Sequence, residues 1–284
     1  MDIKSSLKDC KTFLLDCDGV LWMNNRIINR SNVAVKALQK QGHSVYFVSN
    51  TVFHTSQDIL QKLQRFDVKA QIHLKSINFI KSVYVIGPDS IRRELISFGI
   101  RAYTHDEITK LESKATKKAP EIGAIVVGLD YGSISKKINR AIEYLKNEDV
   151  LYFSTDVEYF GYHTDGPIGL GETLEHVRIK CQRTPELFGK PSSKVFESLS
   201  KKFDIDPSTT CMVGDNICTD IVFGKRHNLK TVLVMSGDTN KRDLANYMKY
   251  YDDKHEFYLQ YHAKPDHVCD DLFGLVQTMH DTAL

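Results

Sequence analysis

The sequence contains no apolar run of the roughly 18 residues needed to cross a bilayer. Its longest clean apolar run, AIVVGL at 124–129, has the length of a single strand. Residues 1–11, MDIKSSLKDCK, are polar and lack the apolar segment of a secretory signal peptide. These absences disfavour a membrane protein, and we expect a cytoplasmic location.

The six cysteines and 11 histidines form neither a CxxC nor an HExxH motif, so the sequence offers no zinc signature. The cysteines are dispersed and several lie in apolar segments, so we expect reduced and mostly buried thiols. The formal net charge is only +2, from 38 basic and 36 acidic residues. Without an excess of basic residues we expect neither nucleic acid nor an anionic membrane as a partner.

The chain of 284 residues is 42% hydrophobic and 26% charged, which is typical of a globular protein with one large domain or two. Apolar strand-like segments at 12–18 and 44–50 alternate with helical patterns at 30–42 and 56–66. The same alternation returns between 186 and 279. Apolar strands that alternate with helices predict a parallel sheet covered on both faces.

A second set of elements lies between these two regions. Its strand-like segments are near 83–88, 122–130 and 150–156, and its helical segments are near 89–98, 134–147 and 171–182. The polar stretch 109–121 is interpreted as a surface loop. The predicted fold class is therefore α/β: a Rossmann-like three-layer core with a parallel sheet, formed by 1–82 and 185–284, and an α/β domain inserted at 83–184.

Five apolar strand-like segments of this sequence end in a polar residue. These residues are Asp16, Ser49, Lys190, Asp215 and Ser236. In open α/β sheets the carboxyl ends of the strands line the ligand crevice, so the pattern indicates a site at that edge.

Asp16 and Asp18 occur two positions apart in the apolar segment FLLDCDGVLW. Two carboxylates so close repel each other, and one would stay protonated unless a cation lay between them. A hard divalent ion such as Mg²⁺ prefers oxygen ligands and also suits phosphate chemistry. Taken alone, DCDG favours a turn with exposed aspartates, which Gly19 would permit.

The segment GDNICTD at 214–220 places Asp215 at the end of a strand and Asp220 in the first turn of a helix. Both are candidate metal ligands, although acidic residues in a first turn often only complement the helix dipole. Lys190, in FGKPSS, is a candidate phosphate ligand or an ordinary surface lysine.

The segment FVSNT supplies Ser49, Asn50 and Thr51 as hydrogen-bond donors for a phosphate oxygen. The alternative is a helix cap or a turn. Each of these signals is weak alone. In the order DxD, Ser, Lys, GDxxxxD they supply what metal-assisted phosphoryl transfer needs: paired acids, a hydroxyl, an amide and a cation.

The segments DCDGVLW, FVSNT, FGKPS and VGDNICTDI resemble the four motifs of the haloacid dehalogenase-like hydrolase superfamily. The greatest similarity is to its group of 4-nitrophenylphosphatases, phosphoglycolate phosphatases and pyridoxal phosphatases, and it covers nearly the whole chain. The resemblance implies a Mg²⁺-dependent phosphoric monoester hydrolase acting on small phosphorylated metabolites such as 4-nitrophenyl phosphate or 2-phosphoglycolate. Pyridoxal phosphate or a sugar phosphate is an alternative substrate, and a non-catalytic binding protein of the same fold is the alternative of another class.

The resemblance also implies the catalytic and metal-binding roles. Asp16 would attack phosphorus and form an aspartyl-phosphate, and Asp18 would act as general acid and then as general base. Mg²⁺ would be held by Asp16, the backbone carbonyl of Asp18 and Asp215, with Asp220 in support.

The phosphoryl oxygens would be bound by Ser49, Asn50, Thr51 and Lys190. The inserted domain would be a cap over the site, through which relatives often form homodimers. Where family members often have arginine and an acidic residue, this chain has Asn216 and Cys218.

Residues 156–172 of the cap are expected to select the substrate. The family often has Thr-Asn/Asp-x-Asp where this sequence has TDVE, so that Glu158 replaces a shorter acid. Tyr159, Tyr162 and His163 are the candidate contacts with the leaving group. Cys17, between the two acids, is a candidate for inactivation by peroxide.

Overall fold

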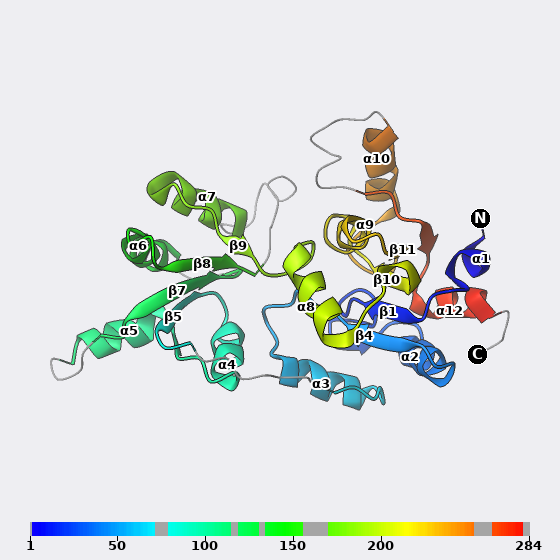
Figure 1. Cartoon of the computed structure of the whole chain (residues 1–284), viewed down its shortest axis with the longest axis horizontal. Coiled ribbons are helices and arrows are strands. Elements are labelled where there is room, and N and C mark those ends of the chain that lie inside the picture. Colours follow the sequence, from blue (N-terminus) through cyan, green and yellow to red (C-terminus); the bar gives the residue numbers. More distant parts are fainter. Residues whose placement is uncertain are drawn as a thin grey trace. The chain divides into compact units, whose positions relative to one another are not determined.

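The structure, a computed structural model, describes residues 2–71, 79–114, 119–130, 134–155, 170–252 and 263–280. The chain divides into two compact units, whose elements are drawn in Figure 1. The first unit comprises Met1–Ser49, Gln64–Lys69 and Gly189–Leu284, and the second comprises Asn50–Leu63 and Ala70–Phe188. The predicted substrate contacts Glu158, Tyr159, Tyr162 and His163 lie outside the described residues.

The first unit is built on a five-stranded sheet with the order β12-β11-β10-β1-β4. All four strand pairings are parallel, as the alternation of strands and helices predicts. Its strands are β1 (Thr12–Leu15), β4 (Ser44–Phe47), β10 (Thr210–Gly214), β11 (Lys230–Val234) and β12 (His267–Cys269).

Helices of the first unit cover both faces of this sheet. They are α1 (Ile3–Leu7), α2 (Ser31–Lys40), α8 (Ser193–Phe203), α9 (Val222–Arg226), α10 (Lys241–Asp252) and α12 (Leu272–His280), with the short helices η1 (Pro207–Thr209) and η2 (Ile217–Ile221). Leu14 of β1 and Met212 of β10 pack against Phe196 of α8 and Phe223 of α9. Helices α1, α2 and α12 pack together on the opposite side of the sheet from α9 (Figure 1). The predicted α/β fold with a parallel sheet is confirmed.

A short hairpin follows β1 and consists of β2 (Trp22–Met23) and β3 (Arg26–Ile27). Its two turn residues, Asn24 and Asn25, have φ values of 46° and 66°. Positive φ at both central residues is typical of a two-residue hairpin turn, and asparagine tolerates it better than most residues.

The second unit contains another five-stranded parallel sheet, with the order β6-β5-β7-β8-β9. Its strands are β5 (Ser82–Ile86), β6 (Ala102–Tyr103), β7 (Ile122–Val127), β8 (Leu151–Ser154) and β9 (Glu186–Leu187). Its helices are α4 (Asp89–Ser97), α5 (His105–Glu112), α6 (Ile134–Leu145) and α7 (Leu170–Cys181), and most of α3 (Ser56–Arg65) also belongs to it.

Two local predictions were wrong. The stretch 109–121 was interpreted as a loop, but α5 extends to Glu112, because a capping box of Thr104 and Glu107 starts a helix there. The segment ELFGK was assigned to the core sheet, but β9 pairs with β8 in the sheet of the second unit.

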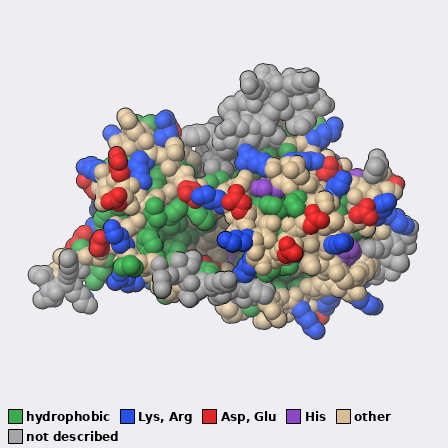
Figure 2. All heavy atoms as spheres, viewed as in Figure 1, with side chains coloured by type: hydrophobic (Ala, Val, Ile, Leu, Met, Phe, Trp, Pro, Cys, Tyr) green, Lys and Arg blue, Asp and Glu red, His purple; other side chains and the backbone are tan. Residues whose placement is uncertain are grey.

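All six cysteines are free; Cys10, Cys17 and Cys211 are buried and the other three are partly buried. Among the described residues, none of the helices is both long and apolar enough to span a bilayer. On the face shown in Figure 2, basic and acidic side chains are interspersed.

Candidate active site

The site begins where two central strands of the first unit end. β1 and β10 are neighbours, with Leu15 opposite Val213, and the backbone N–H of Asp16 donates to the carbonyl of Val213 over 3.0 Å. The ladder therefore holds Asp16 one residue past β1, while Asp215 follows β10 directly. Parallel pairing brings the two carboxylates to the same edge of the sheet.

A third carboxylate, that of Asp220, comes from the π-helical turn η2. Asn216 caps this turn, because its Oδ1 accepts from the N–H groups of Cys218 (2.8 Å) and Thr219 (3.1 Å). The backbone N–H of Asn216 in turn donates to Asp220 Oδ2 over 3.1 Å. Gly214 leaves the space for Asp220, since a Cβ at this glycine would lie 2.1 Å from Asp220 Cγ.

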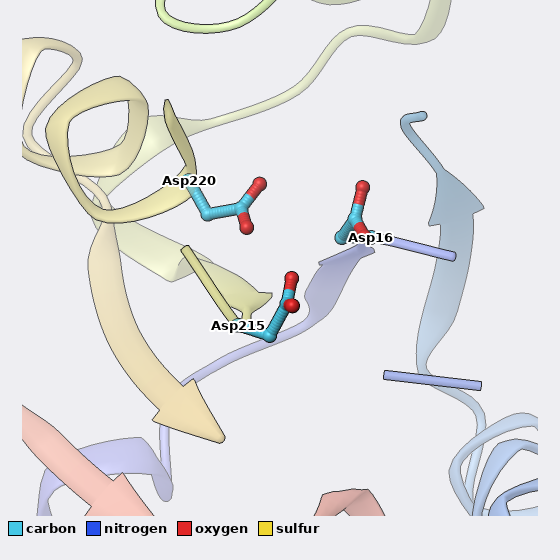
Figure 3. A group of neighbouring side chains, drawn as sticks. All are labelled: Asp16, Asp215 and Asp220. Carbon is cyan, nitrogen blue, oxygen red and sulfur yellow. The ribbon is translucent and has the colours of Figure 1, made fainter. Parts of the chain in front are cut away.

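Asp16, Asp215 and Asp220 form one buried cluster. Each offers a carboxylate oxygen, and these three oxygens lie within 4.8 Å of one another. Figure 3 shows the three carboxylates pointing toward a common space from the ends of β1 and β10 and from η2. We refer to these three residues as the aspartate cluster.

Lys190 is buried beside the aspartate cluster, with only 1% of its surface exposed. Its Nζ lies 2.5 Å from Asp16 Oδ1 and 2.6 Å from Asp220 Oδ1. Burial alone would lower the pKa of this lysine, but the two adjacent carboxylates outweigh it and raise the pKa above its ordinary value. Lys190 is therefore a fixed cation.

The charge of this site is not balanced by protein groups alone. With all three carboxylates ionised, the cluster and the ammonium of Lys190 carry a net charge of −2, which a divalent cation would neutralise. Burial raises the pKa of Asp16 to about 7, with the charge of Lys190 opposing and that of Asp220 adding to the effect. Burial also raises the pKa of Asp215 to about 8, with contributions from the charges of Asp220 and Asp16. Hard oxygen donors in a net negative, buried site fit a divalent metal such as Mg²⁺.

Two loops close around Asp215. The backbone N–H of Asp238 donates to Asp215 Oδ2 over 2.6 Å, and Ser236 Oγ donates to the carbonyl of Gly19 over 2.6 Å. Both loops approach through glycines, since an added Cβ would lie 2.2 Å from Asp215 Oδ2 at Gly19 and 1.9 Å from it at Gly237. Asp238 Oδ2 also accepts from Asn216 Nδ2 over 2.6 Å. Asn216 therefore joins the two loops that carry Asp215 and Asp238.

A glycine substitution tests how closely the loop around Asp215 is packed. We expect Gly19→Ala to destabilise the protein by about 3 kcal/mol, and Gly42→Ala by only about 1 kcal/mol. The two glycines have similar φ values, +83° and +87°, but nothing lies within 4 Å of a Cβ at Gly42. Urea denaturation of both variants measures the difference, and equal losses would show that the close approach to Asp215 costs nothing.

Asp18 lies outside the aspartate cluster, and its side chain is exposed. Its Oδ1 accepts a hydrogen bond of 2.9 Å from Nε1 of Trp22, which is fully buried. Sequence reasoning assigned no role to Trp22. The available signal was a single tryptophan in an apolar segment four residues after an acid, because a buried indole N–H needs an acceptor.

The remaining predicted residues lie near positions in the sequence where the chain passes from one unit to the other. Ser49 belongs to the first unit, lies two residues past β4 and is partly buried. The backbone N–H of the preceding residue, Val48, donates to the carbonyl of Leu15 over 2.8 Å. Asn50 and Thr51 belong to the second unit. Phosphate binding by these three residues stays a prediction. Lys190 does not follow a strand of the core sheet as expected, because β9 lies in the other sheet.

Cys17 is fully buried between Asp16 and Asp18. Burial limits access of peroxide to a thiol, so the structure gives no support for the oxidation expected from sequence.

Two segments of the chain match models of known hydrolase families. Residues 13–101 match the family described as haloacid dehalogenase-like hydrolase, and residues 187–275 match the one described as HAD-hydrolase-like. The chain belongs to the haloacid dehalogenase-like hydrolases.

Several of the similar proteins are named as phosphatases. Phosphoglycolate phosphatase 2 of Arabidopsis thaliana is 30% identical over 271 residues, covering 86% of this chain and 89% of the relative. Human glycerol-3-phosphate phosphatase is 27% identical over 267 residues, covering 84% of this chain and 83% of the relative. The crystal structure of 4-nitrophenylphosphatase from Thermotoga maritima superposes with a TM-score of 0.72 at 19% identity, covering 99% of this chain and 100% of that one. The predicted enzyme class, phosphoric monoester hydrolase, is confirmed.

Proposed function

We propose that this chain hydrolyses small phosphomonoesters, such as 4-nitrophenyl phosphate and 2-phosphoglycolate, with Mg²⁺ and through an aspartyl-phosphate at Asp16. The observation that carries the proposal is the aspartate cluster with Lys190 buried against it. A covalent intermediate divides a difficult displacement into two easier steps, and it requires a nucleophile at a rigid position. The backbone hydrogen bond of Asp16 to β10 supports that assignment.

Each residue of the site has a part in this reaction. Asp16, Asp215 and the backbone carbonyl of Asp18 would hold Mg²⁺, which supplies positive charge to the phosphoryl group when bound. Asp220 orients Lys190 through their ion pair of 2.6 Å. Lys190 supplies a permanent positive charge beside the nucleophile, where negative charge collects on the transferring phosphoryl oxygens. Ser49, Asn50 and Thr51 bind those oxygens by hydrogen bonds.

Asp18 donates a proton in the first step and accepts one in the second. In the first step Asp16 attacks phosphorus, the bond from phosphorus to the ester oxygen breaks, and Asp18 gives its proton to the leaving alcohol. In the second step water attacks the aspartyl-phosphate, Asp18 takes up a proton from that water, and phosphate leaves with Asp16 restored.

The second unit, which contains the predicted insertion 83–184, would act as a cap that limits the size of the substrate. The similar proteins named for phosphoglycolate and glycerol 3-phosphate support small metabolites as substrates. Homodimerisation through the cap is part of the same proposal.

A substrate panel tests this function. We expect the purified protein to hydrolyse 4-nitrophenyl phosphate and at least one of 2-phosphoglycolate, glycerol 3-phosphate, pyridoxal phosphate and a sugar phosphate, and to stop when EDTA removes Mg²⁺. The order of kcat/KM values identifies the substrate class. Absence of Mg²⁺-dependent turnover with every compound would favour a non-catalytic binding protein of the same fold.

Binding of Mg²⁺ is expected to strengthen between pH 6 and pH 8.5. The pKa values of Asp16 and Asp215, about 7 and about 8, are raised above those of the unfolded chain, so their protonation stabilises the metal-free protein. That stability is present at low pH and is lost as the pH rises through these values. Mg²⁺ must displace the protons, so its affinity and the rise in Tm that it causes grow with pH. Calorimetric titration in buffers of different ionisation heat measures the released protons; an affinity independent of pH contradicts the expectation.

A further inference from the structure

Trp22 is held tightly against the loop that carries Asp18. The N–H of Gly19 donates to the carbonyl of Trp22 over 2.8 Å, and the N–H of Trp22 donates to the carbonyl of Cys17 over 3.3 Å. The indole ring is fully buried, and its centroid lies 5.9 Å from that of Phe66. The ring therefore has a fixed position relative to the DCDG backbone.

The side chain of Asp18 needs such a fixed neighbour. It is exposed and lies outside the aspartate cluster, so no ion pair of the described residues restrains it. The hydrogen bond of 2.9 Å from Trp22 Nε1 to Asp18 Oδ1 supplies the restraint. A hydrogen bond to a carboxylate is charge-assisted and stronger than one between neutral groups.

The direction of this hydrogen bond has a chemical consequence. An indole N–H can only donate, so the oxygen it contacts has to accept. When Asp18 is protonated, its carbonyl oxygen is a better acceptor than its hydroxyl oxygen, so the hydrogen bond from the indole to Oδ1 favours the proton on Oδ2. We propose that Trp22 is a positioning residue, which fixes Oδ2 of Asp18 as the oxygen that carries the proton for the leaving group.

This inference rests on the proposed role of Asp18 as general acid. In the step concerned, the bond between phosphorus and the ester oxygen breaks as Asp16 forms its bond to phosphorus. The proton on Asp18 Oδ2 moves to the departing oxygen, which leaves as a neutral alcohol, and Asp18 becomes a carboxylate. Without the indole N–H, either oxygen can hold the proton and the side chain can rotate, so fewer encounters are productive.

The test is Trp22→Phe, assayed by kcat/KM on a series of phosphomonoesters with increasingly poor leaving groups. This parameter reports the first step alone, before hydrolysis of the intermediate. A poor alkoxide leaving group needs the proton, whereas 4-nitrophenolate leaves with little help. We expect the ratio of kcat/KM for 4-nitrophenyl phosphate to that for an alkyl phosphate to rise by about 10-fold. Loss by an equal factor across the series would show a structural role only and overturn the inference.

Two controls separate the hydrogen bond from the shape of the ring. Phe66→Leu changes the packing of the indole without removing its N–H, so it should leave the ratio unchanged. Because Trp22 is the only tryptophan, 3-benzothienylalanine can replace it alone, with sulfur in place of the N–H group. This nearly isosteric replacement should reproduce the effect of Trp22→Phe even if that variant folds poorly; a ratio equal to that of the parent enzyme would refute the inference.

The variant Asp18→Asn distinguishes a failure of this inference from a failure of the proposed function. If Asp18→Asn makes turnover strongly dependent on the leaving group and Trp22→Phe does not, Asp18 is the acid and Trp22 does not position it. If neither substitution changes the dependence, the role of Asp18 itself is wrong, and the inference falls with it.

Discussion

Asp16→Asn is expected to reduce hydrolysis of 4-nitrophenyl phosphate by about 10⁴-fold or more while the protein stays folded. The amide of asparagine is a poor nucleophile, so the aspartyl-phosphate cannot form. Asparagine has nearly the same size as aspartate, and the N–H of residue 16 still donates to Val213, so the sheet edge is preserved. Steady-state rates with Mg²⁺, together with circular dichroism and Tm, measure both parts of the expectation.

Asp9→Asn is the matched control for this experiment. Asp9 is an exposed residue of the same N-terminal segment, so its substitution should change the rate by less than twofold. Asp16→Asn should still take up Mg²⁺, with lower affinity, because Asp215 and Asp220 remain. If the variant hydrolyses 4-nitrophenyl phosphate near the parent rate, the nucleophile has been assigned to the wrong residue.

The positions of Asp16 and Asp215 could be predicted from sequence because local patterns determine them. Each follows an apolar segment, and apolar segments that alternate with helices form parallel strands whose carboxyl ends share an edge. The register of β1 and β10 then brings the two acids together. The helices α2, α3, α4, α6, α7 and α8 were predictable for the same reason, since their apolar residues recur at helical spacing.

Elements with short or irregular patterns could not be predicted. β9 has only two residues, and its pairing with β8 is a long-range contact, so the sequence near Lys190 does not reveal which sheet it joins. Helix α10, by contrast, was missed although Leu244, Tyr247 and Tyr251 recur at helical spacing. Leu244 and Tyr247 pack against Ile217, Ile221 and Leu233.

Contacts that depend on irregular backbone geometry could not be predicted from sequence either. The ion pair of Lys190 with Asp220 depends on the π-helical geometry of η2, which no residue pattern predicts. The contact of Trp22 with Asp18 depends on the hairpin β2–β3. The hairpin has a local signal, two consecutive asparagines between Met23 and Arg26, but its function in orienting Asp18 follows only from the structure.

Lys190→Met is expected to destabilise the first unit by about 3–5 kcal/mol at pH 8. Methionine fills a similar volume but leaves the carboxylates of Asp16 and Asp220 buried without their cation. Lys225→Met is the matched control. This substitution removes an ion pair of 2.5 Å between Lys225 and Asp266, whose two side chains are 34% and 30% exposed. Its loss should lower the free energy of unfolding by about 1 kcal/mol or less. Urea denaturation followed by fluorescence of Trp22, the only tryptophan, measures both losses within this unit.

The cause of that loss can be separated from the loss of packing. Adding Asp220→Asn to Lys190→Met removes one of the two carboxylates left without a partner, so the double variant should recover about 1–3 kcal/mol of the lost stability. Recovery identifies charge as the main effect, because the asparagine restores no contact that the methionine lost. Turnover should stay low in both variants, since neither supplies a cation beside the phosphoryl group. Equal stabilities of the single and double variants would instead assign the loss to packing, and Lys190 would then act by its volume and not as the counter-ion of the aspartate cluster.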